Sequence, residues 1–162
     1  MTVVHKLPLV VLASALLSAS PNAGGAAVTP FTAMAGVWSG DGTITMSSGT
    51  QERLRCRAQY GVRGGGNDLQ LNLRCASESY NFDLSGNAEY QDGTISGSWS
   101  ESTRNAAGTI SGRATGDHIV AAARGNNFSA NLSLTTRGRR QTVAIQPQGT
   151  DVTGVSIILS RG

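Results

Sequence analysis

The sequence contains few residues of the kinds on which metal binding and base recognition usually depend. Lysine occurs only at Lys6, histidine only at His5 and His118, and cysteine only at Cys56 and Cys75. So few histidines and cysteines exclude a Cys/His zinc site, and we expect no metal. Aromatic residues make up 5% of the chain, too few to provide a stacking platform for bases. We therefore expect no nucleic-acid partner.

The chain also lacks an apolar run long enough to cross a bilayer. The longest run begins at Leu7 and is about 11 residues long, whereas a transmembrane helix needs about 20. A basic start precedes this run and small residues follow it, which is the layout of a secretory signal peptide cleaved after Ala23 or Ala27. An uncleaved membrane anchor is the less favoured alternative. We predict a signal peptide at 1–27, one domain at 28–162, no transmembrane segment after cleavage, and a periplasmic or secreted protein.

The two cysteines of an exported chain predict one disulfide. They lie in two segments, 52–60 and 68–76, in which apolar and polar residues alternate and between which the turn-rich GVRGGGN stands. Residues that face each other across an antiparallel pair point to the same side of the sheet. A hairpin with Cys56 opposite Cys75 then also places apolar residues opposite one another, namely Ala58 and Leu73, Tyr60 and Leu71, and Val62 and Leu69.

Similar alternation recurs through the rest of the domain and predicts an all-β fold. It is clear at 80–84, 128–134, 143–145 and 155–159, with turn residues between the segments and no convincing helical period. We expect about ten short antiparallel strands, which leaves a closed up-and-down barrel or a two-sheet sandwich. The barrel is favoured because closure removes edge strands and because glycines inside strands permit sharp bends.

A repeated pentapeptide, Gly-Thr-Ile-Ser-Gly at 93–97 and 108–112, predicts a further hairpin. One register sets Ile95 opposite Gly112 and Gly97 opposite Ile110, so that each large side chain meets a gap. A slip of two residues keeps every face correct, so alternation alone does not choose between the registers. A solenoid would need three or more similar units, and only a degraded third, at 149–154, is present.

The first predicted strand, GVWSGDGTI at 36–44, resembles the start of calycin barrels: lipocalins, fatty-acid-binding proteins and nitrobindin-like proteins. The matching residues are Gly36, Trp38, Gly40 and Gly42. The resemblance implies a calycin-like barrel in which an arginine near the end of the last strand packs on the motif tryptophan. Arg161 would then cover Trp38; the alternative is that Trp38 is an ordinary core residue and Arg161 a frayed end. The whole layout is also similar to that of small exported alphaproteobacterial proteins, which implies no activity.

Two ligand types implied by the resemblance do not match these residues. Nitrobindin-like barrels hold haem through a histidine near the C-terminal end, and this chain has no histidine after His118, so we expect no cofactor. Fatty-acid-binding proteins hold a carboxylate with inward arginines on late strands. Here Arg137, Arg139 and Arg140 gather in a predicted turn, where we expect them in solvent.

Candidate catalytic groups are few, and we expect no enzyme. His118 could act as a base oriented by Asp117, but adjacent strand residues point to opposite faces, so we expect an ordinary turn histidine. Glu101 lies on the same face of its strand as Trp99, and we expect its side chain to reach solvent at the end of that strand. No Gly-x-Ser-x-Gly nucleophile elbow is present.

The alternation assigns a set of large side chains to the barrel interior, where they would line a cavity or fill a solid core. Our first hypothesis is an exported, monomeric, non-enzymatic barrel that binds a small apolar or amphipathic molecule among them. The set is Trp38, Leu54, Tyr60, Leu71, Leu73, Phe82, Trp99, Ile110, Phe128, Leu132 and Val143.

A second hypothesis is a solid barrel that contacts an anionic envelope surface. Arg53, Arg55 and Arg57 share the outward face of one strand, and the cysteine register places Arg74 beside Arg57. Like charges opposed across strands cost stability and invite an anionic partner, although a merely solvated face is the simpler interpretation.

Overall fold

The computed structural model describes residues 28–162; the predicted signal peptide lies outside them. This part of the chain forms ten strands and two short 3-10 helices and contains no helix that could cross a bilayer. In chain order the elements are η1 (Thr32–Met34), β1 (Gly36–Met46), β2 (Gln51–Arg63), η2 (Gly64–Gly66), β3 (Asp68–Ala76), β4 (Asn81–Gln91), β5 (Thr94–Glu101), β6 (Ala106–Thr115), β7 (His118–Gly125), β8 (Phe128–Arg137), β9 (Arg140–Gln148) and β10 (Val152–Arg161).

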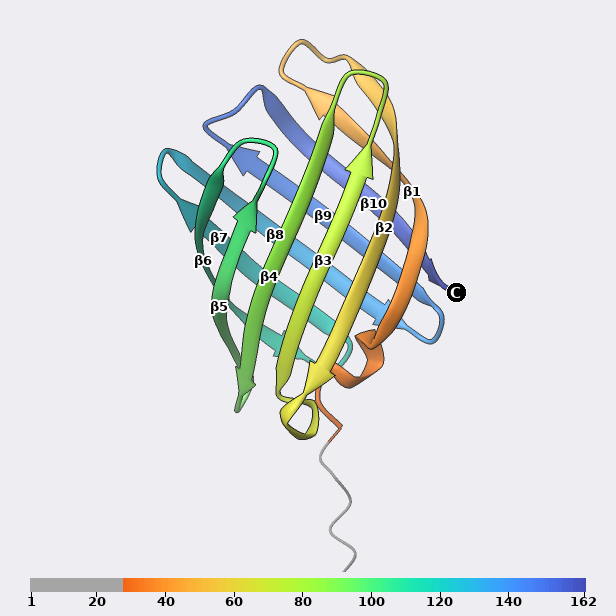
Figure 1. Ribbon diagram of the computed structural model, residues 1–162, viewed down its shortest axis with the longest axis vertical. Coiled ribbons are helices and arrows are strands. Elements are labelled where there is room, and N and C mark those ends of the chain that lie inside the picture. The colour runs from red at the N-terminus through yellow and green to blue at the C-terminus, as the bar shows by residue number, and fades with distance from the viewer. Residues whose placement is uncertain (1–27) are drawn as a thin grey trace, which may run out of the picture.

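The strands form a closed antiparallel barrel in which each pairs with its neighbours in sequence and β1 pairs with β10. Figure 1 shows β3 and β4 in front, crossing β8 and β9 behind them at a steep angle. Along the closing pair Ile44 faces Val155 and Trp38 faces Arg161. The predicted all-β barrel is confirmed, and the sandwich alternative is wrong, because this pairing leaves neither end of the sheet as an open edge.

Glycine in the opening motif permits this closure. A Cβ atom at Gly40 would lie 2.0 Å from the carbonyl oxygen of Ile158 on β10, well inside contact distance. Gly40 therefore lets β1 approach the last strand more closely than any side chain would allow.

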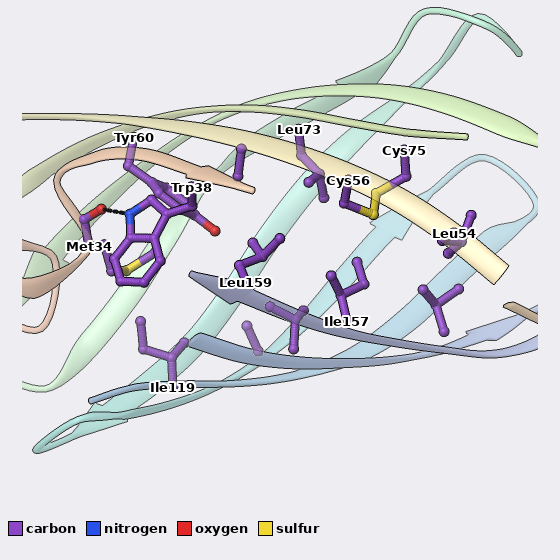
Figure 2. Close-up of a cluster of buried hydrophobic side chains, with 14 of the residues drawn as sticks. Met34, Trp38, Leu54, Cys56, Tyr60, Leu73, Cys75, Ile119, Ile157 and Leu159 are labelled. Carbon is purple, nitrogen blue, oxygen red and sulfur yellow. Dashed lines mark hydrogen bonds between the residues drawn. A yellow bond between two sulfur atoms is a disulfide. The ribbon is translucent and has the colours of Figure 1, made fainter. Parts of the chain in front are cut away.

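The predicted disulfide hairpin is confirmed in every pair. Cys56 on β2 is bonded to Cys75 on β3, and the register sets Ala58 opposite Leu73, Tyr60 opposite Leu71 and Val62 opposite Leu69. Both cysteines are buried inside the barrel (Figure 2). The covalent bond and the apolar faces therefore specify the same register.

The repeated pentapeptide forms the facing strands β5 and β6, so the solenoid alternative is wrong. Of the two registers that alternation allows, the structure has Ile95 opposite Gly112 and Gly97 opposite Ile110. A Cβ at Gly97 would also lie 2.0 Å from the carbonyl oxygen of Asn87 on the other neighbouring strand, β4. The repeat is thus a structural device in which each isoleucine faces a glycine.

The largest core cluster lies against β10, β1, β2 and β3. Figure 2 shows Leu54, Cys56 and Leu73 on one side of the interior, facing Ile157 and Leu159 on the other. A smaller cluster gathers around Trp99 with Ala123 and Ala130.

Gly97 and Gly154 provide a matched test of the close strand approach. Gly97→Ala should destabilise the protein by about 1–3 kcal/mol, because the added methyl group displaces the β4 backbone. Gly154→Ala should have little effect, because nothing lies within 4 Å of the added Cβ. Urea unfolding of both variants measures the difference, and equal midpoints would contradict the close contact.

Candidate functional site

One end of the barrel is closed by the segment before β1. Phe31 and Met34, beside and within η1, are 1% and 2% exposed and belong to the main core cluster. The ring of Phe31 meets the ring of Tyr90 edge-on, with centroids 6.2 Å apart. In Figure 1 η1 lies under the lower ends of β1 and β2. Two large apolar side chains therefore block this end.

Trp38 and Arg161 complete the closure. The indole Nε1 of Trp38 donates a hydrogen bond to the carbonyl oxygen of Met34 at 2.7 Å (Figure 2). The guanidinium of Arg161 lies over the indole, 4.7 Å from the ring centroid, and also donates to the carbonyl oxygen of Ala33. The arrangement expected from the calycin resemblance is confirmed, and Arg161 is not a frayed end.

A buried polar bridge lies near the same end. The Tyr60 hydroxyl donates to Gln141 Oε1 at 2.6 Å, and Gln141 Nε2 donates to Thr136 Oγ1 at 3.0 Å. Burial raises the pKa of the Tyr60 phenol far above its usual value, which outweighs the opposite effect of the Gln141 hydrogen bond. Gln141 was not recognised from the sequence, although it lies two residues before Val143 and so shares the inward face of that strand.

The side chains predicted to lie inside all belong to the two core clusters or pack against them, but they divide by exposure. One group is buried: Trp38, Leu54, Tyr60, Leu73, Trp99 and Val143. The other group is only half-buried: Leu71, Phe82, Ile110, Phe128 and Leu132. Ligand binding by these residues stays a prediction.

Trp99 lies in the smaller cluster, 8% exposed, as the alternation predicted. Its neighbours across the sheet are Gly86 on β4 and Gly108 on β6, which leave room for the indole. The indole Nε1 donates to the carbonyl oxygen of Thr109 at 3.1 Å, and the ring meets Phe128 edge-on at 5.4 Å. Trp99 therefore has a fixed position on the inner surface.

Glu101 does not reach solvent, so that expectation is wrong. It is 9% exposed, and its carboxylate accepts hydrogen bonds from the backbone N–H groups of Asp83, Thr103 and Arg104 and from the Thr103 hydroxyl. Burial raises the pKa of Glu101, but these hydrogen bonds outweigh it and hold the pKa below the usual 4.5. Glu101 thus organises the β5–β6 turn at the rim, the end of the barrel opposite η1.

A second carboxylate, Glu52, organises the β3–β4 loop at this end and was not recognised from the sequence. Hydrogen bonds from the hydroxyls of Ser77, at 2.6 Å, and Ser79, and from the Ser79 N–H, lower its pKa. The two loops also touch, because the Arg104 guanidinium lies 4.2 Å from the ring centroid of Tyr80. The loops of this rim are therefore held together by side-chain contacts.

The predicted arginine stripe lies on the outer face of β2 and β3. Arg53 pairs with Asp41 at 3.1 Å and Arg74 with Asp83 at 2.9 Å. Arg57 faces Arg74 directly across the strand pair, as the cysteine register predicted. The stripe is therefore partly neutralised by acids on β1 and β4.

His118 and Asp117 do not form the acid–base pair considered above. The Asp117 carboxylate accepts from Arg137, which lowers its pKa, while His118 Nδ1 lies 2.9 Å from Thr135 Oγ1. His118 precedes the buried Ile119 in β7 and so points outward. A haem inside the barrel cannot use this histidine, and the described residues therefore do not fit haem.

Comparison with known proteins shows which fold this chain resembles but does not assign the chain to a family. No family model and no curated protein matches the sequence. Among solved structures, Rv2717c from M. tuberculosis matches with a TM-score of 0.64 at 13% identity, over 83% of this chain and 94% of its own. The S-type phycobiliprotein lyase CPES from Guillardia theta matches with a TM-score of 0.58 at 11% identity, over 82% and 90%. The chain is thus similar in fold to calycin-like barrels.

Removing the Glu101 charge tests its role in the rim. Glu101→Gln should cost about 2 kcal/mol at neutral pH, because an amide cannot accept all four hydrogen bonds. Since the folded state lowers the pKa, the stabilisation is full above pH 4.5 and is lost as the pH falls through the folded-state pKa. Urea unfolding of the unaltered protein and of Glu101→Gln should therefore show a difference in the free energy of unfolding that shrinks as the pH falls below 4.5.

Glu89→Gln is the matched control, because Glu89 is exposed on the outer face of β4. It should change the free energy of unfolding by less than about 0.5 kcal/mol. A Glu101→Gln effect as small as this would contradict the structural role.

Proposed function

We propose that this protein is an exported, non-enzymatic barrel that binds a small apolar or amphipathic molecule in its interior. The observation that carries the proposal is the unequal packing of the inward apolar residues. Leu54 on β2 and Ile157 and Leu159 on β10 are at most 1% exposed. Six inward residues of β4, β6, β8 and β9 are only half-buried, although Ala130 and Val143 on the same strands are buried. The six are Phe82, Leu84, Ile110, Leu132, Leu134 and Ile145.

Partial exposure on the inside of a closed barrel supports the presence of interior space, because side chains in a solid core exclude water from one another. The residues that border this space are apolar, so a ligand with an apolar body would bury surface against them. Entry from the end away from η1 follows, since Phe31 and Met34 fill the other end. Lipocalins and fatty-acid-binding proteins, which the opening motif resembles, bind small molecules inside such barrels.

Binding without catalysis is supported by the state of the candidate catalytic groups. Glu101 is held by three hydrogen bonds from its own turn and one from Asp83 on β4, and Asp117 is held by Arg137. Export is supported by the Cys56–Cys75 disulfide, which is typical of an oxidising compartment.

A second candidate function, contact with an anionic envelope surface, is supported by the arginine stripe. Three exposed arginines follow one another on the outer face of β2, and Arg74 lies beside them on β3. Such a face attracts anions in a salt-dependent way.

A neutral apolar dye, N-phenyl-1-naphthylamine, tests the interior site. The dye should bind, fatty acids should displace it, and added salt should have no effect. Leu132→Trp should weaken dye binding at least about tenfold by filling the interior. Dye fluorescence, excited directly, measures binding.

Asn131→Trp is the matched control, because Asn131 is the preceding residue on β8 and is exposed. Leu132→Ala adds a second control, since it enlarges the interior and should preserve binding, while near-ultraviolet circular dichroism checks that each variant is folded. No dye binding by the unaltered protein, or equal affinity in the Leu132 and Asn131 tryptophan variants, would overturn the proposal.

A further inference from the structure

An open hollow of about 420 Å³ lies on the outer face of β2, β3 and β4, toward the end of the barrel opposite η1. Three arginines, Arg55, Arg57 and Arg74, line it together with the exposed Asn81. Thr103, from the turn that Glu101 organises, lies at its border. Positive side chains therefore surround a concave surface rather than a flat one.

The charges around this hollow do not balance. Asp83 pairs with Arg74 at 2.9 Å, and Asp41, which faces Arg55 across β1 and β2, pairs with Arg53 instead. Within residues 28–162 neither Arg55 nor Arg57 forms an ion pair. One carboxylate therefore faces three guanidinium groups, which leaves two positive charges.

The strand register makes this excess of positive charge energetically unfavourable. Arg57 and Arg74 occupy directly opposed positions, where like charges repel. A bound anion would relieve that repulsion. Guanidinium groups present two parallel N–H donors that match the oxygens of phosphate, so several of them around a hollow suit a tetrahedral oxyanion.

We propose that this hollow is a binding site for a phosphate group, held by Arg55 and Arg57 with Arg74 beside them. The inference rests on the second candidate function and adds a defined site to it. The phosphate could belong to a lipid headgroup or be free in solution, since both present the same oxygens. Phosphate binding at this site does not depend on a ligand inside the barrel.

A neighbouring hollow on the same side of the barrel shows why the arginines matter. It measures about 520 Å³ and is lined by Arg63, Asp68 and Glu89. Arg63 faces Asp68 and Asp68 faces Glu89 across the strands, so its charges are of both signs. Concavity alone therefore does not favour an anion at that place.

Titration of ¹⁵N-labelled protein with inorganic phosphate tests the site. Binding should saturate and should shift the amide resonances of Ala76, Asn81 and Thr103 around the hollow. Arg57→Ser should weaken binding at least about tenfold, because it removes charge-assisted hydrogen bonds. Arg53→Ser, made together with Asp41→Asn so that Asp41 is not released toward Arg55, removes an arginine from the same face of β2 outside the hollow and should change the affinity by no more than about twofold.

Vesicles distinguish the two sources of phosphate. If the protein binds phosphatidylcholine vesicles only when they contain phosphatidylglycerol, and Arg57→Ser reduces this binding more than Arg53→Ser with Asp41→Asn does, the site takes a lipid headgroup. If inorganic phosphate binds with the same variant pattern and the vesicles do not, the site takes soluble phosphate.

Equal losses in the two variants would overturn the site and leave only diffuse attraction by the stripe. Absence of binding to both phosphate and vesicles would overturn the site and the second candidate function together.

Discussion

The pairing of β1 with β10 is the constraint on which the rest of the structure depends. Once the sheet closes, each strand residue points either into one enclosed space or toward solvent, and no edge remains. Closure requires the two strands to approach within a distance that a side chain at Gly40 would prevent. The interior, the rim and the arginine face all have their positions because this pairing is made.

The two ends of the barrel are built by different interactions. Apolar side chains before β1, together with the Trp38–Arg161 contact, fill one end. At the other end two carboxylates, Glu52 and Glu101, gather hydrogen bonds from their loops, so the rim is ordered by charge. Apolar packing therefore closes one end, and hydrogen-bonded loops order the other.

The two proposed sites lie on opposite faces of the barrel wall, one inside and one outside. On β2, Leu54, Cys56 and Ala58 face inward and are buried, whereas Arg53, Arg55 and Arg57 face outward. The disulfide to β3 holds this wall in a single register, which sets Arg57 against Arg74 as firmly as it sets Ala58 against Leu73. An apolar ligand inside and an oxyanion outside would therefore be bound independently.

The sequence by itself determined the local pattern: ten alternating segments, the Cys56–Cys75 register and the inward position of Trp99. These features follow from the alternation of side chains every two residues along a strand and from one disulfide between the two strands of a hairpin. Both relate residues that are near neighbours in the fold. Only the tertiary structure decided the register of the repeated pentapeptide, the burial of Glu101, the Tyr60–Gln141 bridge and which inward residues are half-buried. Each depends on how residues of different strands and loops lie in space, such as Gln141 of β9 beside Tyr60 of β2, and alternation along one strand carries no information about such distances.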